Sequence, residues 1–193
     1  MKSNNVHRKQ AKCWNIPGHA HFLTFSCYQR LPLLTNEVWR SWLGQEVRTA
    51  CDDLLFALWA YVFMPEHVHL LVHPKQSVYS ISDFRYRLKR PFAERVMEKL
   101  KEGGSPLLDR LRTVQGGRVR YRFWQAGGGH DLNLWTMSKI IAKAEYCHRN
   151  PIQRRLVKSS EQWRWSSFRW LEMGRREGEP LHLDDWDERT DVE

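Results

Sequence analysis

The first third of the chain alternates between strand-like and helix-like spacing of its apolar residues. Residues 21–28 (HFLTFSCY) are rich in aromatic and β-branched side chains and follow the breaker pair Pro17-Gly18, which predicts a strand. Apolar residues between 38 and 47 then recur at helical spacing after Asn36, a residue type favoured at helix N-caps. This segment is predicted to be a short amphipathic helix that ends near Asp52-Asp53.

A buried hairpin and a second helix are predicted next. Residues 54–63 and 67–72 are nearly continuous apolar runs on either side of the turn Met64-Pro65-Glu66. From residue 77 to about 101 helical spacing returns, with basic side chains on the other face. Pro91 is expected to kink or break this helix.

Glycine-rich breakers divide the remainder of the chain. Residues 118–124 alternate basic with apolar or aromatic side chains, which predicts an edge strand. After Gly127-Gly128-Gly129 the apolar residues have helical spacing as far as Asn150-Pro151, which predicts a third helix directly after the glycines.

The predicted order of elements is strand, helix, strand, strand, helix, strand, with one more helix to follow. This is the order of a ferredoxin-like (split βαβ) α+β fold, in which two helices cover one face of an antiparallel sheet. We expect a basic N-terminal arm at residues 1–16 and one domain at 17–170, with the C-terminal helix outside its core unit. An acidic, mobile tail is expected at 171–193.

The charge of the chain favours a polyanionic partner. Lys and Arg number 31 against 22 Asp and Glu, which gives a formal net charge of +9 and a pI of about 9.6. Residues 85–122 hold twelve basic and four acidic side chains, whereas residues 172–193 hold nine acidic and three basic ones. The simplest alternative is a solvated basic face. The side chains that we expect to contact nucleic-acid phosphates are Arg85, Arg87, Lys89, Arg90, Arg118, Arg120 and Arg122.

Cysteine usage and hydropathy narrow the class of protein. The four cysteines form no CxxC pair, which fits reduced thiols better than a disulfide framework or a cysteine zinc site. The chain has no apolar run of 18 residues and no apolar N-terminal stretch that could serve as a signal peptide. We therefore expect a cytoplasmic, nucleoid-associated protein with no membrane partner.

Candidate metal chemistry is concentrated in the strand-like run PEHVHLLVHP. Side chains alternate across a strand, so His67 and His69 share one face at a separation of roughly 6 to 7 Å. Two imidazoles side by side suit a divalent metal, provided that a third ligand comes from elsewhere. The alternative is a pair of partly exposed sheet histidines without a ligand.

Five segments of the chain together resemble the REP-associated branch of the single-tyrosine HUH transposases. They are PGHAHFLTFSCYQRLPLLT, AYVFMPEHVHLLVHP, RFWQAGGGHDLNLW, EYCHRNPIQRRLV and EQWRWSSFR, and they extend from about residue 17 to residue 169. The resemblance implies a nuclease domain that binds single-stranded DNA, usually as a hairpin, and cuts it with Mg²⁺ or Mn²⁺ held by His67 and His69. It also implies a homodimer, and a tyrosine that attacks phosphorus to leave a 5′-phosphotyrosyl DNA and a free 3′-OH.

The chain departs from the family pattern at the glycine run. Relatives typically carry the tyrosine directly after these glycines, in a pattern like GGGYDRN, but this chain has His130. Either Tyr121 substitutes, or less favourably Tyr146, whose segment resembles one in which the tyrosine is structural. Alternatively, His130 itself attacks phosphorus or acts as a base for water. In the third reading, cleavage has been lost and a domesticated DNA-binding protein is left.

The third metal ligand is implied by the same resemblance. In the family it comes from the helix that bears the tyrosine, about one turn further on, which points to Asn133. Asp131 is a second possibility, although we favour helix capping for it. A zinc hydrolase with a small substrate is disfavoured by the basic stretch and by the lack of an HExxH motif.

Overall fold

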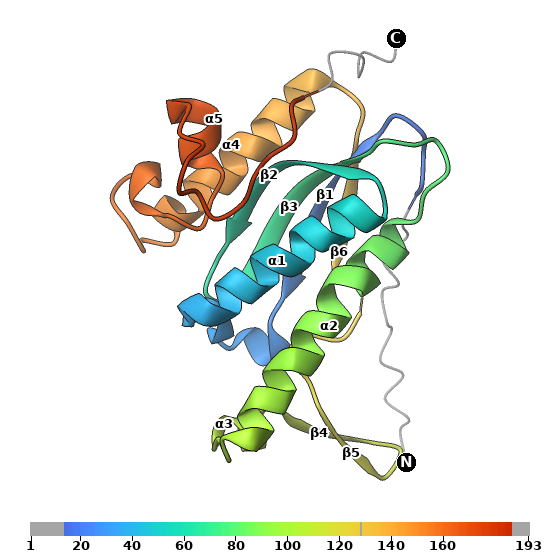
Figure 1. The fold of residues 1–193 in the computed structure, drawn as a ribbon, viewed down its shortest axis with the longest axis vertical. Helices are drawn as coiled ribbons and strands as arrows, with labels where there is room; N and C mark the ends of the chain where they lie inside the picture. Colours follow the sequence, from blue (N-terminus) through green and yellow to red (C-terminus); the bar gives the residue numbers. More distant parts are fainter. Residues whose placement is uncertain (1–13, 128, 187–193) are drawn as a thin grey trace, which may run out of the picture.

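The computed structural model describes residues 14–127 and 129–186 (Figure 1). Its centre is a four-stranded antiparallel sheet with the strand order β2-β3-β1-β6. The four strands are β1 (Ala20–Ser26), β2 (Phe56–Phe63), β3 (His67–Pro74) and β6 (His130–Leu134). The helices α1 (Glu37–Asp53) and α2 (Ile81–Glu102) lie side by side on one face, so the predicted ferredoxin-like fold is confirmed.

Local sequence signals explain the elements that were predicted well. Asn36 caps α1, because its side chain accepts a hydrogen bond from the amide of Trp39 at 3.1 Å. The connection between β2 and β3 is tight, with the amide of Met64 donating to the carbonyl of His67 at 2.8 Å. The helix α2 continues through Pro91 without a break, and it buries Leu88 and Phe92 on either side of the proline.

The second face of the sheet is covered by α4 (Met137–Gln153). Ile140, Ala144 and Cys147 of α4 are buried in one apolar cluster with residues of β1 and β2, among them Phe22 and Trp59. A larger cluster lies between the sheet and the helices α1 and α2. The final helix of the prediction therefore forms a second covering layer. Short elements complete the chain, namely α3 (Leu107–Leu111), β4 (Arg112–Gln115), β5 (Arg118–Tyr121), α5 (Phe168–Met173) and three 3₁₀ turns at Tyr28–Arg30, Leu33–Thr35 and Ser160–Gln162.

The prediction of the fourth strand was wrong. The basic segment pairs as β5 with β4 in a separate two-stranded hairpin that projects from the end of α2, and β6 takes the edge of the main sheet (Figure 1). Residues 130–134 were predicted to be helical because the helical spacing of apolar residues was taken to begin directly after the glycines, and Asp131 and Asn133 are residue types depleted in strands. Both find polar partners across the sheet, which the sequence pattern does not reveal.

The outer edge of β2 is closed by residues from the C-terminal part of the chain. The amide of Phe63 donates to the carbonyl of Trp165, and the amide of Ser167 donates to the carbonyl of Tyr61. Further along, the amide of Leu58 donates to a carboxylate oxygen of Asp184 at 3.0 Å. These contacts satisfy an edge that would otherwise present unpaired backbone groups.

The tail from residue 171 was expected to be mobile, but its described part packs on the domain. Leu181 and Leu183 are buried in the cluster beneath α1. Burial raises the pKa of Asp184, but hydrogen bonds from Lys75, the Leu58 amide and Arg48 outweigh this and leave that pKa below its ordinary value. The buried side chains of two leucines and the hydrogen bonds of one carboxylate therefore hold this acidic segment against the domain. Residues 187–193, and residues 1–13 of the predicted basic arm, lie outside the described part.

Within residues 14–127 and 129–186, the helices are too short or too polar for any of them to traverse a lipid bilayer.

Candidate active site

His67 and His69 converge on the face of the sheet that α4 covers. Both side chains point to this face because they are two residues apart in β3, and both residues are almost fully buried. Their Nε2 atoms lie 3.1 Å apart, and their rings are nearly perpendicular. The two imidazoles therefore aim their nitrogens at one point.

The other nitrogen of each ring is held by an oxygen atom. Nδ1 of His67 lies 2.9 Å from a carboxylate oxygen of Glu66, and Nδ1 of His69 lies 2.8 Å from the hydroxyl of Thr24. Oxygen partners of this kind fix the ring orientation and tautomer of metal-binding histidines. The Glu66 carboxylate can only accept, so Nδ1 of His67 carries the proton and donates it.

Burial keeps both imidazoles neutral. Burial lowers the pKa of His67, and nearby arginines lower it further, while Glu66 acts in the opposite direction. For His69, burial together with His67, Lys143 and Arg154 lowers the pKa to about 3. A neutral His67 that is protonated on Nδ1 presents a lone pair at Nε2, as a metal ligand must.

Two side chains of α4 reach the histidine pair. The ring of Tyr146 lies edge-on to the ring of His69, with 5.2 Å between their centroids, and the residue is 38% exposed. The buried amide of Asn150, one helical turn further on, places Nδ2 at 3.1 Å from Nε2 of His69. Lys143 lies over the ring of Tyr146 at 5.4 Å.

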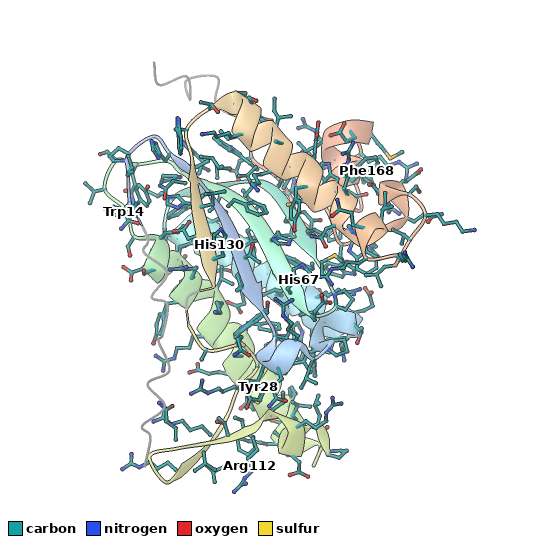
Figure 2. The ribbon with its side chains drawn as sticks, turned by 180° about the vertical axis from the view of Figure 1, so that it is seen from behind. Trp14, Tyr28, His67, Arg112, His130 and Phe168 are labelled. Carbon is teal, nitrogen blue, oxygen red and sulfur yellow. The ribbon has the colours of Figure 1, made fainter. Side chains whose placement is uncertain are left out.

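His130 lies on the same face as the pair, two strands from His69. Thr24 of β1 is opposite His69 on one side and opposite His130 on the other, so the three residues form a row across the sheet. Figure 2 shows this face, with His67 on β3 and His130 at the start of β6. His130 is exposed and lines a hollow of about 230 Å³ together with Thr24 and Arg30.

The residues expected to supply a third ligand lie on the opposite face of the sheet. Asn133 pairs in register with His21, and its side chain donates to the carbonyl of Trp14 at 2.8 Å. Asp131 forms a buried ion pair with His21, with 2.8 Å between Oδ1 and Nδ1. Because residues 130–134 are a strand, Asn133 is not one helical turn beyond His130, and the reason for choosing it no longer applies. Asp131 for the same reason does not cap a helix.

Tyr121 is also remote from the histidine pair. It ends β5 in the separate hairpin, where its ring lies under Lys101 at 5.6 Å. Of the candidate nucleophiles, only Tyr146 contacts the pair. Asn150 was not expected at the site. The four-residue spacing of Tyr146 and Asn150 is the signal that would put both on one face of a helix, but their distance from His69 depends on how α4 packs.

The seven basic residues expected to contact phosphates fall into three groups. Arg87 is engaged by Asp53 at 2.6 Å and Glu46 at 3.6 Å. Arg118 and Arg120 are exposed on the hairpin (Figure 1), where β5 lies at the opposite end of the molecule from α4. Arg85, Lys89, Arg90 and Arg122 gather instead around one cavity beside α2.

A divalent ion fits this donor set. Two ligands that bind one ion at about 2.1 Å and at a right angle are about 3.0 Å apart, close to the 3.1 Å between the two Nε2 atoms. Among the described residues, no three His, Cys, Asp or Glu side chains are grouped to hold a metal. The Asn150 side chain lies within reach of the pair, and its amide oxygen is the atom that could serve as a ligand.

One family model matches the N-terminal half of the domain. The model described as "Transposase IS200 like" matches residues 16–108, which include β1, both histidines and all of α2. The matched segment is just under half of the chain, and over it the chain is similar to the IS200-like transposases.

One solved structure shares the fold of this chain. A REP-associated tyrosine transposase bound to a REP hairpin superposes with a TM-score of 0.64 at 19% identity, over 94% of this chain and 92% of that one. A putative transposase from Deinococcus radiodurans R1 gives a TM-score of 0.42 at 22% identity, over 74% of this chain and 96% of that one. A search of curated proteins found no match.

Proposed function

We propose that this chain binds single-stranded DNA, in the form of hairpin ends, and cleaves one strand through Tyr146 beside the His67 and His69 pair. The observation that carries the proposal is the contact between the rings of Tyr146 and His69 on one face of the sheet. The net charge of +9 and the transposase family support a DNA partner. The solved transposase that shares this fold was bound to a DNA hairpin.

In the proposed reaction the hydroxyl oxygen of Tyr146 attacks the scissile phosphorus. The bond from that oxygen to phosphorus forms as the bond from phosphorus to the 3′-oxygen breaks. The tyrosine proton passes to water, and the departing 3′-oxygen takes up a proton to become a free 3′-OH. Lys143 supplies positive charge beside the attacking ring, where phosphate charge develops.

His67, His69 and Asn150 would hold Mg²⁺ or Mn²⁺ at this site. When bound, such an ion supplies Lewis-acid polarisation of a phosphoryl oxygen. Glu66 and Thr24 keep the two imidazoles oriented toward it.

His130 is proposed to contact DNA rather than to attack it. Neighbouring strands are about 4.8 Å apart, so a residue two strands from His69 lies roughly 10 Å away along the sheet. The hollow that His130 lines with Arg30 is open and basic, which suits a phosphate next to the one that is cut.

The test is a denaturing gel with a hairpin library of single-stranded DNA, labelled at the 3′ end, in the presence of Mn²⁺. A 5′-phosphotyrosyl product stays attached to the labelled fragment and migrates with the protein. We expect this adduct with the native chain and its loss in Tyr146→Phe and His67→Ala. Tyr121→Phe is the matched control and should form the adduct normally.

Other outcomes select the remaining hypotheses. An adduct that persists in Tyr146→Phe refutes the assignment of the nucleophile. If that adduct is acid-labile and disappears in His130→Ala, His130 attacks phosphorus. Binding without cleavage of any hairpin, with Mn²⁺ or with Mg²⁺, would make the chain the cleavage-deficient DNA-binding remnant.

The homodimer implied by the family resemblance is also part of this proposal. Among the described residues β6 pairs only with β1, so its outer edge faces away from the sheet. Light scattering at micromolar concentration should give twice the 23.2 kDa mass of the chain, and a mass of one chain would refute it.

A further inference from the structure

A cavity of about 450 Å³ lies between α2 and the segment that follows β5, on the face of the sheet opposite the histidine pair. This volume is within the range of cavities that hold small ligands, about 300 to 1,000 Å³. Basic and aromatic side chains dominate its lining, chiefly Arg85, Tyr86, Lys89, Arg90, Tyr121 and Trp124. The cavity takes no part in the reaction described above.

The inner wall of the cavity carries buried positive charge. Arg85 is 7% exposed, and Nζ of Lys89 lies 5.3 Å from the ring of Phe25 and 5.8 Å from the ring of Trp124. Burial, and secondarily Arg85, lowers the pKa of Lys89 to about 8, and no carboxylate contributes to that pKa. Arg85 is buried and Lys89 is half-buried, and positive charge that is partly removed from water would stabilise an anion in the cavity.

Arg87, two residues before Lys89 on α2, differs from Lys89 in having acidic partners. Arg87 points to the other side of α2, where Asp53 and Glu46 neutralise it. Asp53 and Glu46 thus neutralise Arg87, outside the cavity, whereas no carboxylate contributes to the pKa of Lys89.

The rim of the cavity carries exposed aromatic rings. Tyr86 is 59% exposed and Tyr121 is 36% exposed, and the hydroxyl of Tyr86 is hydrogen-bonded to Arg90. The guanidinium of Arg90 lies 5.4 Å from the Tyr86 ring and is paired with Glu94, which holds both side chains in place. Exposed rings beside a basic wall are the combination that stacks bases and contacts phosphates in single-strand binding proteins.

We propose that this cavity binds one unpaired nucleotide of single-stranded DNA, with its base against Tyr86 and Tyr121 and its phosphate at Lys89 and Arg85. The inference rests on the proposed function in taking DNA as the ligand, but it does not depend on the proposed cleavage reaction. Trp124 is joined to the end of β1 by a backbone bridge to Cys27, and the chain reaches His130 six residues later. One DNA strand can thus occupy the cavity and continue around the edge of the sheet to the histidine face.

Fluorescence anisotropy with labelled dT20 as the probe tests the proposal. Tyr86→Ala removes one stacking platform and should raise the Kd about 5- to 150-fold, whereas Tyr86→Phe keeps the ring and should restore the native Kd. Lys89→Met removes one phosphate contact, so the slope of log affinity against log salt should fall by about 0.7. Lys99→Met is the matched control, because Lys99 is on the same helix, outside the cavity and paired with Glu102.

The results separate this inference from the function on which it rests. If the native chain binds dT20 and both Tyr86→Ala and Lys89→Met match it in Kd and salt slope, the inference is overturned while the DNA function stands. If the native chain does not bind dT20 or a hairpin, both fail. Free dTMP is the competitor that distinguishes a nucleotide within a strand from a free one. Displacement of dT20 by micromolar dTMP would refute a strand-binding cavity.

Discussion

Gly129 provides the sharpest test of how the active face is built. It has a φ of +78°, and a Cβ atom at this position would lie 2.1 Å from the carbonyl oxygen of Thr24. Real contacts to a Cβ are essentially never below 3.0 Å, so Gly129→Ala must displace the backbone of β1 or β6 by about 1 Å. The left-handed conformation costs a residue with a side chain about 1–2 kcal/mol, and overpacking adds about 1–3 kcal/mol. The expected loss is therefore about 2–5 kcal/mol of unfolding free energy.

Gly127→Ala is the control for this prediction. Gly127 also has a positive φ, of +96°, but a Cβ there meets nothing within 4 Å. Only the conformational cost of about 1–2 kcal/mol applies to it. Urea unfolding followed by circular dichroism gives both values. A loss in Gly129→Ala no larger than that in Gly127→Ala would refute the argument that the glycine run lets β6 approach Thr24.

Three further predictions concern single contacts. Thr24→Val removes the hydroxyl that holds Nδ1 of His69 and should weaken Mn²⁺ binding about 10- to 100-fold by titration calorimetry; an unchanged affinity would mean that the orientation of His69 has another cause. The lowered pKa of Asp184 means that its ion pairs stabilise the fold above about pH 4, the unfolded value, and that this contribution is lost as the pH falls through the folded value. Asp184→Asn should therefore be less stable than the native chain at pH 7, with the gap closing in urea titrations below about pH 4; a gap independent of pH would exclude the ion pairs as its source. Asn36→Ala should cost about 0.5–2 kcal/mol in the same assay, since it removes the cap of α1, and no change would show that solvent satisfies that helix end equally well.

Local patterns in the sequence were sufficient to predict the hairpin of β2 and β3, which carries His67 and His69. The period of two in β3 determines that His67 and His69 share a face, and apolar runs on each side of a short turn determine the hairpin. The same reasoning failed for β6, because Asp131 and Asn133 look unsuited to a strand until His21 and Trp14 are known to be their partners.

The position of Tyr146 shows the same limit at the active face. The sequence placed Tyr146 correctly on the helix that follows the glycine run. Its contact with His69 depends on the packing of α4 across the sheet, which is set by residues far apart in the chain. The family resemblance instead pointed to Asn133 as the third ligand, and Tyr121 was favoured over Tyr146 as the substitute nucleophile, but Asn133 and Tyr121 both lie away from the histidine pair.

The closure of β2 by the C-terminal segment bears on how this chain folds during synthesis. All eight residues of β2 are buried, and Leu58 completes its outer hydrogen bonding with Asp184, 126 residues later. At translation rates of about 5–20 residues per second, roughly 6 to 25 s pass between the synthesis of Leu58 and that of Asp184. Throughout this interval the nascent chain displays FALWAYVF, an uncharged apolar segment of the type that pairs with other chains. Chaperones that shield apolar segments, and slow dilute expression, should therefore raise the yield of this protein more than changes to its surface.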